Sequence, residues 1–421
     1  MDKLLVEGGR RLKGSIKVSG AKNACLPIMA ASLLTGESCT IRNIPDLKDV
    51  STMIEILAAL GRKVKREGDV LRIEEGEATS QTAPYELVST MRASIVVLGP
   101  LLSRYGKARV SFPGGCVIGP RPIDLHLKGL RALGADIRID EGYIVAGAKK
   151  LKGTRIYLGG HFGSSVLATA NTLMGAVLAE GETVIENAAC EPEVVDLANF
   201  LIAMGAYIKG TGTPTIRVKG VDKLRGVDYS IVPDRIEAGT YMIAGVLTDG
   251  RLFLENARLE HNLALVDKLQ ECGAAVEEKE NGLDVYRNTR TVRPTDITTL
   301  TYPGFPTDLQ AQIMSLLTLS DGISVITEKV YPERFIHISE LNRMGANIIL
   351  EGSTAIIKGV KRLSGAPVMA SDLRASAALI LAGLVAEGAT EISRIYHLDR
   401  GYEHIEDKLS AVGAKIERIK E

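Results

Sequence analysis

The sequence has no tryptophan, and aromatic residues make up only 4% of the chain. Nucleic-acid-binding surfaces usually stack bases on aromatic side chains and neutralise phosphates with a basic excess. Lysine plus arginine and aspartate plus glutamate each number 51, so this chain has no such excess. We therefore expect no nucleic-acid partner, and the composition disfavours nucleic-acid end processing. A local cationic pocket is still compatible with a neutral chain.

Long apolar runs are also missing. The longest, at residues 375–386, is interrupted by Ser376 and is too short to cross a bilayer. Near the amino terminus, Asp2, Lys3 and Glu7 interrupt any signal-like stretch. We expect no secretion signal, no membrane partner and a cytoplasmic location.

Cysteine is scarce, with five residues and no paired spacing typical of zinc sites. Four of them lie among apolar neighbours and are expected to be packed thiols: Cys25, Cys39, Cys190 and Cys272. No phosphate-binding Gly-Lys-Ser/Thr loop is present, and the histidines show no ligand spacing. These patterns predict neither a metal nor a cofactor.

The fifth cysteine has a different setting. Cys116 lies in the segment Phe-Pro-Gly-Gly-Cys-Val-Ile-Gly-Pro-Arg-Pro, residues 112–122, five residues before Arg121. Glycine lets the backbone approach a ligand, proline stiffens the flanks, and a nearby cation favours the reactive thiolate. We interpret the segment as a movable lid with a reactive thiol; the alternative is a surface loop with an idle cysteine.

The chain repeats one unit six times. A helix-like segment ending in glycine recurs every 68 to 73 residues, at Gly61, Gly134, Gly205, Gly273, Gly345 and Gly413. A second glycine, ending a more apolar segment, recurs every 66 to 75 residues, at Gly36, Gly106, Gly181, Gly250, Gly322 and Gly388. Two independent landmarks with one period predict six copies of an α/β unit.

The two helices of each unit differ in polarity. The first kind is amphipathic; His126 lies in one such helix and could face solvent. The second kind is apolar nearly all round and must be buried on every side. Six units could form one ring or two sets of three, and two sets fit the size limit on a single core better.

The seam is expected near Val232. We predict one domain at residues 22–232 and another at residues 1–21 plus 233–421, with a ligand cleft between them. A strand pair at residues 3–6 and 15–18 should join the second domain's sheet. The run Gly-Thr-Gly-Thr-Pro at residues 210–214 is predicted to be a hairpin turn rather than a nucleotide loop.

Charged residues recur where the helices start. The apolar helices have, at or near their starts, Lys22, Arg92, Leu167, Ile236, Asp308 and Arg374. The amphipathic helices have Asp49, Arg121, Glu193, Glu260, Arg334 and Arg400. A cation in a first turn opposes the helix dipole by about 0.3–1 kcal/mol, and an anionic ligand would reverse that penalty.

These cations predict a small, highly charged anionic substrate beside Cys116 and Asp308, an arrangement that suggests an acid and a base. The alternative is local pairing, such as Arg374 with Asp372 or Arg400 with Asp399.

The chain resembles the enolpyruvyl transferases over essentially its full length. The resemblance is carried by Gly-Ala-Lys-Asn-Ala at residues 20–24, the Cys116 segment continuing to His126, Pro-Thr-Asp-Leu-Gln at residues 306–310, Glu-Arg-Phe at residues 333–335, Asp-Leu-Arg at residues 372–374 and Asp-Arg-Gly at residues 399–401. It implies an inside-out α/β barrel with two domains, each of three βαβαββ units around central helices.

The resemblance also implies a reaction. The enolpyruvyl group of phosphoenolpyruvate would move to the 3′-hydroxyl of UDP-N-acetylglucosamine, releasing phosphate by addition and elimination, as the first committed step of peptidoglycan synthesis. Cys116 would be the proton donor and Asp308 would take the hydroxyl proton. Both act with the cations Lys22 and Arg400.

The remaining site residues come from the same resemblance. Phosphate contacts are expected from Lys22, Arg121 and Arg400, and carboxylate contacts from Arg334 with Lys22 and Arg400. Asn23, Arg92 and Val330 match sugar-nucleotide contacts. The uridine end would be held by Arg121, Pro122, Ile123, Asp124 and Leu125, while Asp372 and Arg374 line the same cleft.

One stretch departs from the family pattern. Where a lysine and a glycine are usual, residues 163–169 are Gly-Ser-Ser-Val-Leu-Ala-Thr, with Leu167 in the place of the glycine. Ser165 and Val166 are carried over as diphosphate contacts, and His161 is a candidate for the missing cation; neutral drift is the alternative.

Two rival functions are weighed against this one. A sister enzyme acting on shikimate phosphate would share the repeat but not the Cys116 segment or residues 121–125. A catalytically silent sugar-nucleotide sensor is compatible with the altered stretch, but not with intact Cys116 and Asp308. The sequence leaves the oligomeric state open.

Overall fold

The computed structural model describes residues 2–77, 80–114, 123–160 and 163–420. Contacts divide these residues into two compact units, each with its own apolar core. The first unit is drawn from residues 20–232, and the second from residues 2–19 and 233–420.

The first unit has three four-stranded sheets, in the orders β14-β3-β5-β4, β6-β7-β9-β8 and β10-β11-β13-β12. In each, the first two strands are parallel and the other two pairings are antiparallel. The strands are β3 (Cys39–Arg42), β4 (Arg62–Glu67), β5 (Val70–Glu75), β6 (Thr82–Ala83), β7 (Lys107–Ser111), β8 (Asp136–Asp140), β9 (Tyr143–Gly147), β10 (Arg155–Tyr157), β11 (Glu182–Glu186), β12 (Tyr207–Lys209), β13 (Thr215–Lys219) and β14 (Asp228–Ser230).

The second unit repeats this pairing pattern in the sheets β16-β17-β15-β2, β18-β19-β21-β20 and β22-β23-β1-β24. Its strands are β1 (Lys3–Glu7), β2 (Lys13–Lys17), β15 (Arg251–Glu255), β16 (Ala274–Lys279), β17 (Gly282–Arg287), β18 (Ile297–Thr298), β19 (Ile323–Thr327), β20 (Asn347–Glu351), β21 (Thr354–Lys358), β22 (Pro367–Met369), β23 (Ala389–Ser393) and β24 (Lys415–Ile419). Six sheets of one design confirm the predicted sixfold repeat and the α/β class.

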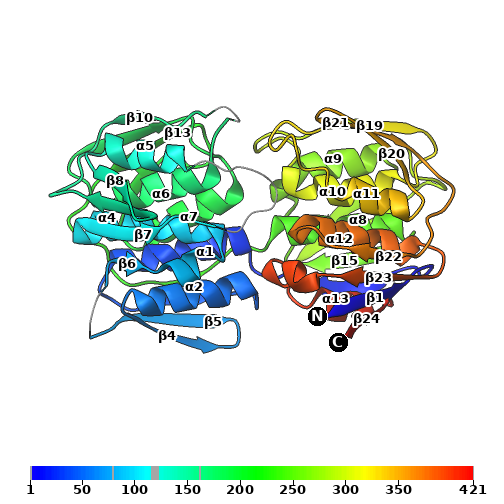
Figure 1. Ribbon diagram of the computed structural model, residues 1–421, viewed down its shortest axis with the longest axis horizontal. Coiled ribbons are helices and arrows are strands. Elements are labelled where there is room, and N and C mark those ends of the chain that lie inside the picture. Colours follow the sequence, from blue (N-terminus) through cyan, green and yellow to red (C-terminus); the bar gives the residue numbers. More distant parts are fainter. Residues whose placement is uncertain (1, 78–79, 115–122, 161–162, 421) are drawn as a thin grey trace. The chain divides into compact units, whose positions relative to one another are not determined.

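Apolar helices lie at the centre of each unit, inside its sheets (Figure 1). The first unit has α1 (Lys22–Ala31) with η1 (Ser32–Leu34), η2 (Arg92–Val97) with α4 (Leu98–Tyr105), and α6 (Val166–Ala176). The second has α8 (Arg235–Leu247), η4 (Thr307–Leu309) with α10 (Gln310–Leu317), and α12 (Leu373–Val385). Within each unit the three segments contact one another.

The amphipathic helices cover the outside of these bundles. They are α2 (Lys48–Ala59), α5 (Asp124–Ala132), α7 (Pro192–Ala203), α9 (Leu263–Glu271), α11 (Ile338–Arg343) and α13 (Ile405–Ala411). The described residues also form three short elements: α3 (Tyr85–Val88), η3 (Leu259–His261) and η5 (Ile395–Arg400). The described residues include no helix long and apolar enough to pass through a membrane.

The first glycine series ends these amphipathic helices. In all six cases the glycine stands two residues after the last helical residue, with φ between 87° and 108°. This left-handed conformation ends a helix without strain only when the residue lacks a Cβ. In the second series only Gly106, Gly181 and Gly388 have positive φ.

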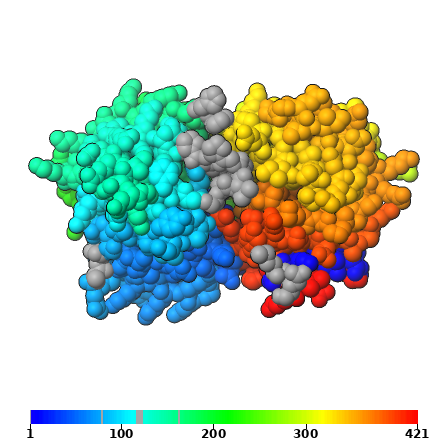
Figure 2. Space-filling model, viewed as in Figure 1, coloured from blue at the N-terminus to red at the C-terminus, as the bar shows by residue number. Residues whose placement is uncertain are grey.

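The amino-terminal strands differ from the prediction. They do join the second unit, but as members of two sheets rather than as a pair: β1 lies between β23 and β24, and β2 pairs with β15. Segments from opposite parts of the sequence, β1 (blue) and β24 (red), are therefore neighbours on the surface of this unit (Figure 2). The hairpin at residues 210–214 is confirmed, since it joins the antiparallel strands β12 and β13.

A buried polar cluster joins the helices of the first unit. The Asn171 side chain accepts from Gly99 N (2.6 Å), donates to Ile95 O (3.0 Å) and lies 3.1 Å from Nδ1 of His126. His126 is only 3% exposed, so it does not face solvent. Burial, with the charge of Arg92 adding to it, lowers the pKa of His126 to about 3.

The burial of neutral His126 predicts an acid-sensitive fold. Between pH 6.5 and about 3, the unfolded chain binds a proton at this residue and the folded protein does not, so falling pH favours unfolding. From pH 7 to pH 5 this group should lower the free energy of unfolding by about 2 kcal/mol. Urea unfolding of His126→Gln should lack that component. The exposed His404→Gln is the control, and equal pH dependence in wild type and His126→Gln would contradict the prediction.

Candidate active site

The predicted site residues fall into two groups, one in each unit. The first half-site comprises Lys22, Asn23, Arg92, Ile123, Asp124, Leu125, Ser165 and Val166. The second half-site comprises Asp308, Val330, Arg334, Asp372, Arg374 and Arg400. Cys116, Arg121, Pro122 and His161 lie outside the described residues.

Most residues of the first half-site lie at the amino ends of the central helices, while Ile123, Asp124 and Leu125 lie at the start of the outer helix α5. Lys22 opens α1, Arg92 opens η2 and Val166 opens α6. The opposite, carboxyl ends of the same helices meet around a cavity of about 720 Å³. Leu34, Ser103 and Leu178 are among the residues that line it. On the amino-terminal side, η2 contacts both α1 and α6.

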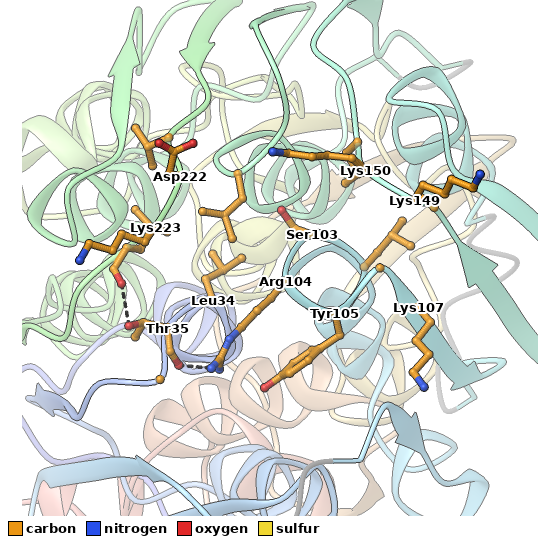
Figure 3. A pocket seen from close by; sticks show the side chains of 18 of the residues that line it. Leu34, Thr35, Ser103, Arg104, Tyr105, Lys107, Lys149, Lys150, Asp222 and Lys223 are labelled. Carbon is orange, nitrogen blue, oxygen red and sulfur yellow. Dashed lines mark hydrogen bonds between the residues drawn. The ribbon is translucent and has the colours of Figure 1, made fainter.

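That cavity is separate from the predicted site. Arg104 extends into it and donates to the carbonyl of Thr35 (2.7 Å), and lysines surround it (Figure 3). Cations at helix carboxyl ends suit the negative end of the dipole. None of the described residues of either half-site lines the cavity.

The cations of the first half-site sit against the helix dipole, as predicted. Lys22 stands in the first turn of α1, which has neither a side-chain cap nor an acid in that turn. Its ammonium lies 3.4 Å from the carboxylate of Asp49, and both side chains are largely buried. Ser165 caps α6, its Oγ accepting from Ala168 N at 3.3 Å. That bond fixes the hydroxyl at the start of α6, within the altered stretch.

The second half-site is built around one carboxylate. Arg334 Nη1 donates to Asp308 Oδ1 at 2.7 Å, and Arg374 Nη2 donates to Asp308 Oδ2 at 3.0 Å. The side chains of the two arginines are 5% and 4% exposed, and that of Asp308 is 28% exposed. Two buried guanidinium groups therefore hold a carboxylate that reaches solvent.

These arginines stay charged in spite of their burial. Burial alone would lower each pKa, but the negative charge of Asp308, helped by other nearby acids, raises the pKa of both Arg334 and Arg374. Charge-assisted hydrogen bonds of this kind are short and strong, and they orient both partners.

The alternative of local pairing is wrong for Arg374. The Asp372 carboxylate instead caps α12, accepting from the backbone N–H groups of Arg374 (2.8 Å) and Ala375 (3.1 Å). Asp399 pairs with Arg418 of β24 at 2.6 Å. Asp372 thus positions the helix start from which the Arg374 guanidinium reaches Asp308.

Two cations that were predicted to lie at helix starts do not lie there. Arg334 lies in a turn four residues before α11, and Arg400 is the last residue of η5, five residues before α13. The helix-dipole argument therefore fails for both. Arg400 nevertheless lies near the other charges, since its charge, after burial, lowers the pKa of His397, and Asp372 acts on the same imidazole.

Polar residues that were not predicted lie behind the second half-site. Tyr402 lies under the Arg374 guanidinium at 5.4 Å, and its hydroxyl is bonded to Thr240 (2.8 Å) and Gln312 (3.0 Å). Glu328 was not predicted either; it accepts a hydrogen bond from the hydroxyl of Thr307, a residue of the 306–310 motif, at 2.9 Å. The position of Tyr402 two residues after Arg400 is the only sequence signal that could have indicated it.

Of the packed thiols predicted, Cys25, Cys39 and Cys272 are buried and Cys190 is half-buried. Burial raises the pKa of Cys272 to about 12 and that of Cys25 still further. Such thiols are poor nucleophiles at neutral pH.

Known proteins and one family model match this chain over all or nearly all of its length. Residues 6–409 match the family model of EPSP synthase (3-phosphoshikimate 1-carboxyvinyltransferase). The chain is 57% identical to UDP-N-acetylglucosamine 1-carboxyvinyltransferase 2 of Carboxydothermus hydrogenoformans, over 100% of both chains. It is 54% identical to UDP-N-acetylglucosamine 1-carboxyvinyltransferase of Methylacidiphilum infernorum, over 100% of this chain and 99% of that one.

Solved structures show the same fold. The enolpyruvyl transferase NikO from Streptomyces tendae superposes with a TM-score of 0.89 at 25% identity, covering 99% of this chain and 98% of that one. EPSP synthase from Acinetobacter baumannii gives 0.79 at 18% identity over 100% of both. The chain therefore belongs to the EPSP synthase family of enolpyruvyl transferases.

Proposed function

We propose that this protein transfers the enolpyruvyl group of phosphoenolpyruvate to the 3′-hydroxyl of UDP-N-acetylglucosamine and releases phosphate. The observation that carries the proposal is the 54–57% identity, over full length, to relatives named for this reaction. The reaction is the first committed step of peptidoglycan synthesis. A cytoplasmic setting fits the buried thiols Cys25, Cys39 and Cys272, which are free.

The chemistry requires an acid, a base and fixed cations. Protonation of the terminal enol carbon makes the neighbouring carbon electron-poor, and the sugar hydroxyl attacks it to give a tetrahedral ketal. Loss of a proton from the new methyl group and departure of phosphate then restore the double bond. The carbon–oxygen bond to phosphate is exchanged for one to the sugar, so no external oxidant or cofactor is needed.

Asp308 is the proposed acceptor of the hydroxyl proton. Its carboxylate is held from two sides by Arg334 and Arg374, yet it remains partly exposed. A carboxylate oxygen can accept more than one hydrogen bond. The arginines thus fix the base where it can orient an attacking hydroxyl, and Cys116 is the proposed proton donor on the enol carbon.

The other residues are proposed as substrate contacts. Lys22, Arg121 and Arg400 would neutralise the phosphate of phosphoenolpyruvate, with Arg334 on its carboxylate side. The sugar nucleotide would be held by Asn23, Arg92, Arg121, Pro122, Ile123, Asp124, Leu125, Ser165, Val166, Val330, Asp372 and Arg374.

Shikimate 3-phosphate is the alternative acceptor, because the matching family model is named for that reaction. With phosphoenolpyruvate present, we expect phosphate release with UDP-N-acetylglucosamine and only background release with shikimate 3-phosphate. A colorimetric phosphate assay decides between them. Release with shikimate 3-phosphate alone would overturn the proposal.

Replacement of the proposed base should stop turnover. Asp308→Ala is expected to lower kcat at least about a hundredfold, the usual scale for a lost acid–base group. Because this change also leaves two buried guanidinium groups without their carboxylate, Asp308→Asn is measured beside it, and folding is checked by circular dichroism. The exposed Asp321→Ala is the matched control. Near-normal kcat in folded Asp308→Asn and Asp308→Ala would exclude the role.

The proposed acid should be the site of covalent inhibition. An epoxide phosphonate such as fosfomycin is expected to add once to the wild-type chain and not to Cys116→Ser, as read by intact-protein mass spectrometry. Cys190→Ser, which removes the half-buried thiol, should label like wild type. An adduct on Cys116→Ser would show that another residue reacts.

A further inference from the structure

Glu328 is a fully buried acid next to the second half-site. It directly follows β19, and its relative exposure is 0%. A buried carboxylate is costly unless hydrogen bonds satisfy both of its oxygens. The Glu328 carboxylate accepts hydrogen bonds from backbone N–H groups and from hydroxyls. These donors identify the segments that the carboxylate holds in place.

Two of these bonds shape the turn that contains Val330. Glu328 Oε1 accepts from the backbone N–H of Val330 at 2.8 Å and from that of Tyr331 at 2.9 Å. The same oxygen accepts from the Thr299 hydroxyl at 2.5 Å. The turn then leads to Arg334, whose N–H donates to Tyr331 O at 2.9 Å.

The fourth bond leads to Asp308. Glu328 Oε2 accepts from the Thr307 hydroxyl at 2.9 Å. Since that hydroxyl donates its proton to Glu328, its lone pairs are left for Arg334 Nη1, which lies 3.1 Å away. The same Nη1 donates to Asp308 at 2.7 Å. A continuous series of hydrogen bonds therefore runs from Glu328 through Thr307 and Arg334 to Asp308.

We propose that Glu328 is a positioning residue for the transferase reaction, fixing the Val330 turn and, through Thr307, the guanidinium that orients Asp308. This inference rests on the proposed function for its kinetic consequences. Its geometric content, the shape of the turn and the direction of the Thr307 hydroxyl, can be measured without turnover.

Replacing Glu328 with glutamine keeps the size of the side chain. It removes the negative charge and replaces one hydrogen-bond acceptor with a donor. With its oxygen toward Val330 and Tyr331, the amide would place N–H groups against Thr307, whose hydroxyl could no longer donate to it. With the amide reversed, its N–H groups would oppose the backbone donors of the turn. Either orientation therefore disturbs the hydrogen bonds to the turn at Val330 and Tyr331 or the hydrogen bond to Thr307.

Glu328→Gln should therefore lower kcat/KM for UDP-N-acetylglucosamine about 10- to 100-fold, with effects on both kcat and KM. The matched control is Asp284→Asn, a buried acid in β17 whose partner is Arg251 rather than a residue of the second half-site. It should lower the melting temperature but leave kcat/KM unchanged. If folded Glu328→Gln kept wild-type kcat and KM, Glu328 would have only a structural role and the proposal would be overturned.

A double-mutant cycle tests the route through Thr307. Thr307→Val keeps the side-chain shape and removes the hydroxyl. If Glu328 orients Arg334 through this hydroxyl, kcat should fall in the double variant no further than in the more damaged single variant. Fully additive losses in kcat would exclude the route.

Hydrogen–deuterium exchange tests the turn without relying on activity. Residues 329–335 should exchange faster in Glu328→Gln than in wild type, and Asp284→Asn should leave them protected. Unchanged protection in Glu328→Gln would overturn the proposal even with an active enzyme. If the wild-type protein released no phosphate with UDP-N-acetylglucosamine, the proposed function would be refuted. The exchange measurement would still test whether Glu328 fixes the turn.

Discussion

The structure depends on helices that have no polar face. In α8 every residue after the first is buried, and in α12 residues 374–384 are all buried. Such helices need apolar partners on all sides, which three sheets and three amphipathic helices provide in each unit. This arrangement also brings the helix starts of a unit together, so a residue at the same point of successive repeats becomes part of one cluster.

That convergence explains where the charges lie. Lys22, Arg92 and Arg374 occupy first turns, where a cation opposes the helix dipole. In the second unit the carboxylate of Asp308 pairs with Arg374. The same carboxylate accepts a hydrogen bond from Arg334, which lies in a turn outside any helix. Fixed cations at such a place suit a substrate with several negative charges, in keeping with phosphoenolpyruvate.

Much of this was accessible from the sequence because repetition amplifies weak signals. A single glycine after a helix indicates little, but six at one spacing predict the helix ends, and all six have the left-handed backbone. Contacts between distant segments carried no such signal. Nothing in the local sequence around Arg334 shows that it bonds to Asp308 or that Asp372 caps α12 instead of pairing with Arg374. For the same reason the sequence predicts β1 and β2 as a pair, although each belongs to a different sheet.

The placement of β1 has a consequence for synthesis of the chain. The first unit is contiguous in sequence, so it can fold as soon as residue 232 has left the ribosome. The second unit needs β1 between β23 and β24, strands that follow the whole of the first unit in the sequence. β1 must therefore wait, with its backbone N–H and C=O groups unpaired by their final partners, until β23 and β24 have been made.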